Sequence, residues 1–98
     1  MTGKRVEFHP EAVAEAGARR EWYEERDPVA ATAFVHELER ALAMVCENPC
    51  AWPRFLAGTR RYVMRRFPFQ VIYRDTAETI QVIAVAHGRR RPGYWKTR

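Results

Sequence analysis

The first alternation of charged and apolar residues in the chain predicts a short strand over residues 4–9. Val6 and Phe8 are the apolar members of this alternation, as a strand with one buried face requires. Pro10 follows directly, and proline favours the first turn of a helix because the amide hydrogen that it lacks has no intrahelical partner there. The pattern therefore predicts a helix over residues 10–26.

A second helix is predicted to start at Asp27-Pro28. Aspartate caps helix N-termini, and proline fits the first helical position. The apolar residues that follow are three or four positions apart, which is the spacing of one buried helix face: Ala30, Phe34, Leu38, Ala41 and Val45. Asn48-Pro49 ends this helix. Since almost nothing separates the two helices, we expect them to pack as an antiparallel hairpin.

Beyond a proline-containing loop at residues 48–58, the pattern changes from a helical period to a period of two. Segments rich in Val, Ile, Tyr and Phe then predict three strands, over residues 60–66, 69–74 and 79–86. The links between them are short enough for an antiparallel meander. A tail follows the last strand, and we expect Trp95 to anchor this tail to the rest of the protein.

These elements predict an α+β fold of order β-α-α-β-β-β, with the helical hairpin packed on one face of an antiparallel sheet. The other face of the sheet is free in this prediction. We expect a single domain over residues 1–98, because each half of so short a chain would be too small for a core of its own. With 47% hydrophobic and 30% charged residues, the composition is that of a globular protein and not of a disordered chain.

The charges of the chain are distributed unevenly between its halves. Residues 1–49 carry 6 Lys and Arg against 10 Asp and Glu, whereas residues 50–98 carry 11 against 2, a net of +9. Such a basic region favours nucleic acid or an acidic protein as a partner. The candidate nucleic-acid-binding residues are Arg60, Arg61, Arg89, Arg90 and Arg91. No apolar run approaches the roughly 20 residues of a membrane-spanning helix, so we expect a cytoplasmic protein without a membrane partner.

Motif patterns exclude several kinds of chemistry. The chain has no glycine-rich phosphate loop, and it has no serine for a serine hydrolase site. Cys46 and Cys50 lack a second pair of ligands at zinc spacing, so we expect no metal and no cofactor.

One titratable residue stands out, because His87 ends the last predicted strand and three arginines follow it closely. With Arg74 on the neighbouring strand, the imidazole could flank one phosphate, while Tyr62 or Tyr94 supplies a hydroxyl group. Such a site would be a metal-free ribonuclease. In the alternative interpretation, His87 only orders the strand end and the arginines form a docking surface.

Three motifs in the second half of the chain carry a family resemblance. They are Arg65-Arg-Phe-Pro-Phe-Gln-Val-Ile-Tyr-Arg74, His87-Gly-Arg-Arg90 and Pro92-Gly-Tyr-Trp95. Together with the preceding strand and helical hairpin, they resemble the RelE/ParE superfamily, the toxins of bacterial type II toxin-antitoxin systems. The resemblance covers nearly the whole chain and implies the RelE/ParE fold.

The resemblance implies a basic, growth-inhibiting toxin that a cognate acidic antitoxin holds inactive. RelE-like members cleave mRNA on the ribosome without a metal, whereas ParE-like members inhibit DNA gyrase by binding and cut no RNA. We favour ribosome-dependent mRNA cleavage here, with gyrase inhibition as the alternative. The lysines of the RelE-like site are missing, so the predicted catalytic residues are Arg65, Arg74, His87, Arg90 and Tyr94. The predicted antitoxin-binding residues are Arg61, Arg65 and Arg74.

Overall fold

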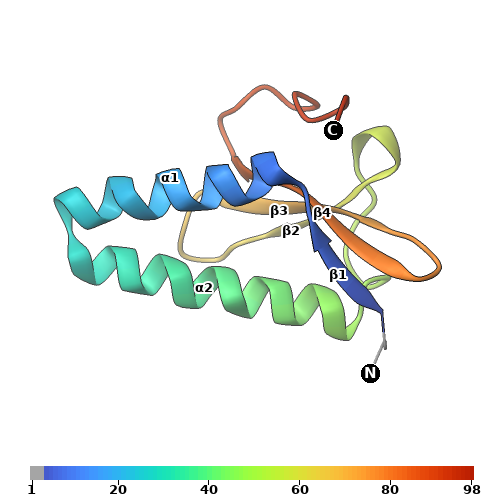
Figure 1. The fold of residues 1–98 in the computed structure, drawn as a ribbon, viewed down its shortest axis with the longest axis horizontal. Coiled ribbons are helices and arrows are strands. Elements are labelled where there is room, and N and C mark those ends of the chain that lie inside the picture. Colours follow the sequence, from blue (N-terminus) through green and yellow to red (C-terminus); the bar gives the residue numbers. More distant parts are fainter. Residues whose placement is uncertain (1–3) are drawn as a thin grey trace.

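The computed structural model describes residues 4–98 and confirms the predicted order of elements (Figure 1). The elements are β1 (Arg5–Phe8), α1 (Pro10–Arg26), α2 (Pro28–Glu47), the short 3-10 helix η1 (Leu56–Gly58), β2 (Arg60–Val63), β3 (Phe69–Asp75) and β4 (Thr79–His87). Both helices have the predicted bounds. The strand predicted over residues 60–66 ends earlier, at Val63.

A single residue, Asp27, joins the two helices and sets their hairpin. Its backbone amide donates to the Tyr23 carbonyl at the end of α1, at 2.6 Å. Its carboxylate accepts from the amides of Val29 and Ala30, at 3.1 and 3.4 Å, and so caps the start of α2. The extended backbone of Asp27 breaks the helical path, and α2 runs back along α1, as Figure 1 shows.

The sheet has the strand order β1-β4-β3-β2. The predicted antiparallel meander is confirmed, since β2 pairs with β3 and β3 with β4 in antiparallel fashion. The prediction of an entirely antiparallel sheet is wrong for β1, which pairs with β4 in parallel. Alternation along a strand shows that a strand forms, but it carries no information about the direction of a neighbour almost 75 residues away.

The helical hairpin packs on one face of the sheet and encloses the main core. The predicted apolar stripe of α2 faces the sheet: Phe34 and Ala41 are buried in this core, and Val45 is buried beside Tyr73 and Ile80. Phe34 packs its ring against Phe67 and Phe69, with centroids 5.5 Å apart in both pairs. These ring contacts determine which face of α2 packs against the sheet.

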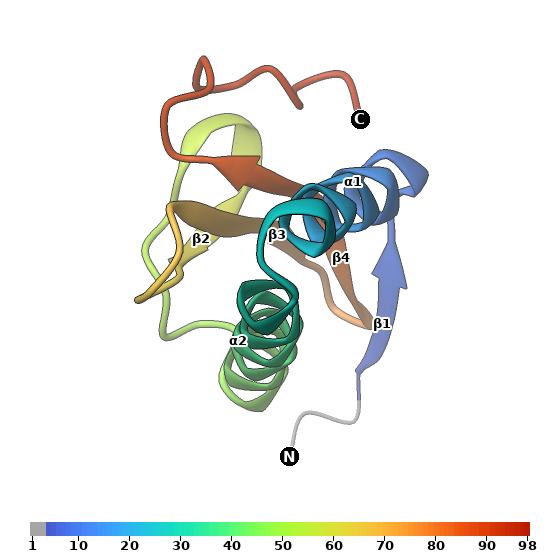
Figure 2. The same cartoon turned by 90° about the vertical axis from the view of Figure 1, so that its left-hand side faces the viewer.

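The prediction that the other face of the sheet is free is wrong. Trp95 is only 1% exposed and packs there against Ile72 and Ile83, with Phe55 partly buried beside it. Figure 2 shows the C-terminal segment on the side of the sheet opposite the hairpin. The predicted anchoring of the tail by Trp95 is thus confirmed. Alternate side chains of the strands place apolar groups on this face of the sheet, and the tail removes them from water.

Replacing Trp95 with alanine tests how strongly the tail depends on this anchor. Trp95→Ala should lower the free energy of unfolding by about 3–5 kcal/mol, because it removes a large buried side chain and leaves a cavity. Urea unfolding followed by circular dichroism measures this loss. Val29→Ala, at a residue that is 79% exposed, should change stability by less than about 0.5 kcal/mol. Equal stabilities of the two variants would contradict the anchoring role.

Alkaline unfolding tests the environment of Tyr73, which is fully buried and donates its hydroxyl hydrogen to the Pro49 carbonyl. Burial raises the pKa of the Tyr73 phenol to about 12. An unfolded tyrosine ionises near pH 10, so the stability due to Tyr73 is complete below about pH 10 and is lost as the pH rises towards 12. The loss should be on the order of 2 kcal/mol. Tyr73→Phe should show a smaller loss over this pH range, and identical pH profiles would refute the assignment.

Candidate functional site

The Glu15 carboxylate joins α1 to β4 and to the C-terminal segment. Its Oε1 atom accepts from the Val85 amide at 3.0 Å. Arg98 binds both carboxylate oxygens, with Nη1 to Oε1 at 2.9 Å and Nη2 to Oε2 at 3.0 Å. The Tyr94 hydroxyl donates to Oε2 at 2.7 Å. One carboxylate therefore holds donors from β4 and from two points of the tail.

The sheet itself explains why an acceptor is needed at this point. β1 pairs with β4 only as far as Phe8 opposite Val82, so the edge of β4 has no neighbouring strand beyond that pair. A strand amide at such an edge needs another acceptor when it is shielded from water. Glu15 supplies it from α1, in place of a longer β1.

This network determines the protonation of its members. The pKa of the Tyr94 phenol lies far above its ordinary value. Burial is the larger cause of this rise, and the hydrogen bond to Glu15 is the second. The hydrogen bond to Glu15 likewise raises the pKa of Arg98. Tyr94 is consequently a hydrogen-bond donor and not a base, and Arg98 keeps its charge.

A polar cavity of about 300 Å³ lies beside this network. It brings together three of the five predicted catalytic residues, namely His87, Arg90 and Tyr94. The Arg90 guanidinium lies over the Tyr94 ring at 3.9 Å from its centroid, and its Nη1 is 3.6 Å from Glu15 Oε2. The remaining lining residues are Glu15, Ala18, Arg19, Trp22, Phe69 and Val85.

Arg74 lies at the other end of the sheet from His87. Phe69 is opposite His87 in the pairing of β3 with β4, whereas Arg74 is opposite Gln81. Phe69 and Arg74 are five positions apart in β3, which is about 17 Å along the strand. The prediction that Arg74 and His87 flank one phosphate is therefore wrong. Arg74 instead donates to the backbone carbonyl of Arg98 at 3.2 Å.

Arg65 lies on a third surface, between α2 and the loop that follows β2. It lines a separate cavity of about 440 Å³ with His36, Glu37 and Arg40. The backbone amides of Arg65 and Arg66 both donate to Glu37 Oε1, at 3.3 Å. Glu37 thus orders the loop, while the two arginine side chains stay exposed.

The other predicted nucleic-acid-binding arginines differ in their contacts. Arg60 donates to the Trp52 carbonyl at 2.8 Å, and Arg61 lies over the Phe55 ring at 4.2 Å from its centroid. Arg89 is exposed, as is Arg91. Two of these cations therefore hold the loop before β2.

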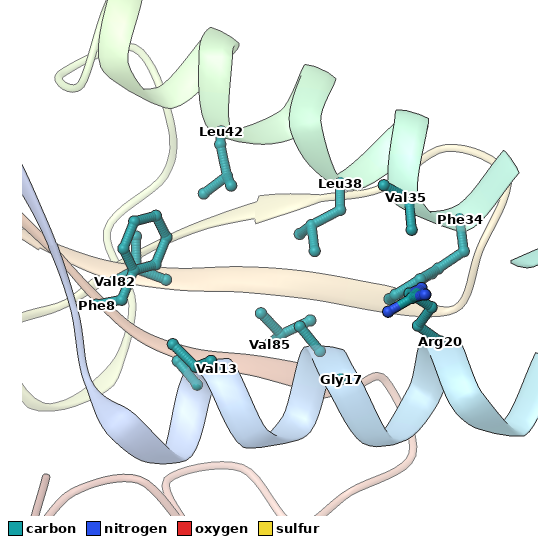
Figure 3. A pocket seen from close by; sticks show the side chains of 12 residues that line it. Phe8, Val13, Gly17, Arg20, Phe34, Val35, Leu38, Leu42, Val82 and Val85 are labelled. Atoms are coloured by element: carbon teal, nitrogen blue, oxygen red, sulfur yellow. The ribbon is translucent and has the colours of Figure 1, made fainter. Parts of the chain in front are cut away.

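Sequence reasoning missed an apolar groove of about 350 Å³ between the two helices. In Figure 3 the leucines and Val35 of α2 face Val13 and Gly17 of α1 across the groove, with Phe8, Val82 and Val85 from β1 and β4 beside them. Small side chains on α1 leave this space, and Arg20 is the one charged residue in its lining. The full lining is Phe8, Ala12, Val13, Ala16, Gly17, Arg20, Phe34, Val35, Leu38, Leu42, Val82 and Val85.

The polar cavity also contains residues to which the sequence analysis gave no role. Glu15, Arg19 and Trp22 are spaced by four and three residues, so they share one face of α1. That spacing was the available signal. Only the packing of α1 on β4 shows that this face meets His87.

Residues 4–98 contain neither a cluster of metal ligands nor a membrane-spanning helix. Within this range, no three His, Cys, Asp or Glu residues lie close enough together to hold a metal ion. No helix there has both the length and the apolar character needed to cross a membrane.

Comparison with known proteins identifies the family. A family model described as the ParE toxin of the type II toxin-antitoxin system, parDE, matches residues 6–92. Among solved structures, a chain of the chromosomal ParDE toxin-antitoxin system from P. aeruginosa superposes with a TM-score of 0.76 at 18% identity, over 89% of this chain and 98% of that one. This likeness shows a shared fold. No curated protein matches the sequence. Since the family model spans nearly all of the chain, the protein belongs to the ParE toxin family of type II toxin-antitoxin systems.

Proposed function

We propose that this toxin inhibits DNA gyrase, and thereby growth, by binding it and not by cutting RNA. The observation that supports gyrase over the ribosome is the separation of the predicted catalytic residues. Arg65, Arg74 and His87 lie on three different surfaces. Metal-free cleavage needs several cations and an acid or base aimed at one phosphate, because the transition-state charge develops at that point.

The residues that do share a cavity support the same conclusion. The Tyr94 hydroxyl group is engaged by Glu15, and Arg90 is close to the same carboxylate. Because the Glu15 carboxylate already engages Tyr94 and Arg98, these two groups are not free to stabilise a phosphorane. A toxin that acts by binding requires no such charge arrangement.

A toxin-antitoxin system includes an antitoxin, and we infer that the antitoxin covers the apolar groove between α1 and α2. Phe8 and Val13 are 48% and 57% exposed in this groove, so a partner would remove much apolar surface from water. An amphipathic segment with apolar residues at helical spacing fits such a groove. Acidic residues on its polar side would complement Arg20 and the basic second half of the chain. The opposite face of the sheet is a poorer site, because Trp95 already occupies it.

An activity assay with two substrates tests the choice of target. The purified toxin should inhibit the supercoiling of relaxed plasmid by gyrase and should leave the mRNA on translating ribosomes intact. Gel electrophoresis of plasmid and of mRNA measures both. As the control, toxin premixed with its antitoxin should leave supercoiling unaffected. Cleaved mRNA together with normal supercoiling would contradict gyrase inhibition and favour the ribosome.

A charge placed in the apolar groove tests where the antitoxin binds. Val13→Glu should weaken antitoxin binding at least tenfold, which is about 1.4 kcal/mol, because the new carboxylate would be buried against an apolar partner. Isothermal titration calorimetry with purified antitoxin measures the affinity. Val29→Glu is the matched control, since Val29 is a helical valine outside the groove and is 79% exposed. It should bind like the wild type.

The arginines predicted to bind the antitoxin offer an alternative binding surface that can be tested in the same assay. Alanine at Arg61, Arg65 and Arg74 would remove the charges that the sequence analysis assigned to antitoxin binding. If these changes abolish binding while Val13→Glu has no effect, the antitoxin covers the arginine surfaces and the groove assignment is wrong.

A further inference from the structure

We propose that the cavity between α2 and the loop that follows β2 binds a di- or triphosphate group through the guanidinium groups of Arg40, Arg65 and Arg66. This is the cavity of about 440 Å³ described above. The inference goes beyond the proposed function, because inhibition of gyrase by binding requires no small anion. It also gives Arg65 a role that differs from the catalytic and antitoxin-binding roles predicted from the sequence.

Two elements bring positive charge to this cavity. α2 contributes Arg40 and, one helical turn before it, His36. These two residues share a face of the helix because they are four positions apart. The loop between β2 and β3 contributes the neighbouring residues Arg65 and Arg66. Three guanidinium groups therefore line one concave site.

The loop that carries Arg65 and Arg66 is held in place by its own contacts. Both backbone amides donate to Glu37 Oε1 on α2, at 3.3 Å. On either side of this pair, Met64 is only 3% exposed and Phe67 packs against the main core. Because the loop is already ordered, an anion would bind there without first having to fix the backbone.

The guanidinium groups of this cavity have no acceptor of their own within the part of the chain that the structure describes. No ion pair or hydrogen bond among residues 4–98 engages the side chains of Arg40, Arg65 and Arg66. By contrast, Arg60 and Arg98 donate to acceptors of the protein itself. Each guanidinium carries five N–H donors, so the three groups leave many donors for a ligand. Like charges that line one cavity also repel one another, and a multivalent anion offsets this repulsion.

The one carboxylate in the lining leaves the cavity positive. Three arginines and Glu37 give a net charge of +2, without counting His36. The two backbone amides that bind Glu37 Oε1 also offset part of its negative charge. The electrostatic field of the lining therefore favours an anion with more than one charge.

A di- or triphosphate group matches this lining. It concentrates several negative charges in a small volume, and its oxygens accept paired hydrogen bonds from guanidinium groups. Tyr62 and His36 complete the polar lining, and each carries a further donor. Ala33 is the one aliphatic residue there, so the cavity offers little to an apolar segment of a protein. A volume of about 440 Å³ lies within the usual range of small-molecule sites. Inorganic triphosphate and nucleotides share this phosphate chemistry, so the experiment must separate them.

Isothermal titration calorimetry on the purified toxin tests the proposal, in magnesium-free buffer at constant ionic strength. Sodium triphosphate and ATP should bind, whereas adenosine, which lacks phosphate, should not. Arg40→Ala, Arg65→Ala and Arg66→Ala should each weaken binding about tenfold, because each removes charged hydrogen bonds to the ligand. Glu37→Gln keeps an acceptor for the loop amides and removes the negative charge, so it should tighten binding about twofold or more. Equal affinities for triphosphate and ATP would show that the phosphates alone are recognised, and tighter binding of ATP would identify a nucleotide.

A matched charge control separates this site from general attraction to a basic protein. Arg54→Ala removes an exposed arginine outside the cavity and should bind like the wild type. The proposal is overturned if neither triphosphate nor ATP binds, or if Arg54→Ala weakens binding as much as Arg65→Ala. Tighter binding of poly-glutamate than of triphosphate would overturn it in favour of an acidic protein. Circular dichroism should confirm that each variant is folded, and Arg40→Ala on the exposed surface of α2 provides the test if a loop variant is not. The assay contains no gyrase, so its result is independent of the proposed function.

Discussion

The Glu15 carboxylate is the interaction on which the architecture of this toxin depends. It accepts from Val85 where β1 no longer covers the edge of β4, and it binds Tyr94 and Arg98 of the tail. Without it, the Val85 amide and the Tyr94 hydroxyl would both lose their acceptor, and an unpartnered buried group costs more than a typical hydrogen bond contributes. The carboxylate thus couples α1, the sheet and the C-terminal segment.

The attached tail gives the two sides of the molecule different chemistry. Trp95 covers the apolar face of the sheet opposite the helices, whereas the apolar groove lies on the other side, between α1 and α2. α1 contributes to two surfaces because residues three or four apart share a face. Val13 and Gly17 line the groove, whereas Arg19 and Trp22 line the polar cavity. The proposed antitoxin site and the polar cavity therefore use different faces of one helix.

The arginines of the second half divide between structural and binding roles. Arg60 holds the loop before β2 through the Trp52 carbonyl, and Arg98 binds Glu15. Arg74 donates to the Arg98 carbonyl and so helps to hold the tail. A guanidinium group has five donors and suits such multiple bonding. The net charge of +9 consequently overstates the positive surface that is available to a partner.

The sequence by itself determined the helices, the meander and the family. Capping at Asp27 and apolar spacing act within about four residues, so the helix bounds 10–26 and 28–47 could be predicted from local pattern. Tertiary structure alone decided the parallel pairing of β1 with β4 and the distance between Arg74 and His87. It also decided that the tail covers the face of the sheet opposite the helices. It also joined Glu15 to Val85, which is 70 positions away. Strand direction, register and such contacts depend on the packing of distant segments, and the alternation within a strand does not encode them.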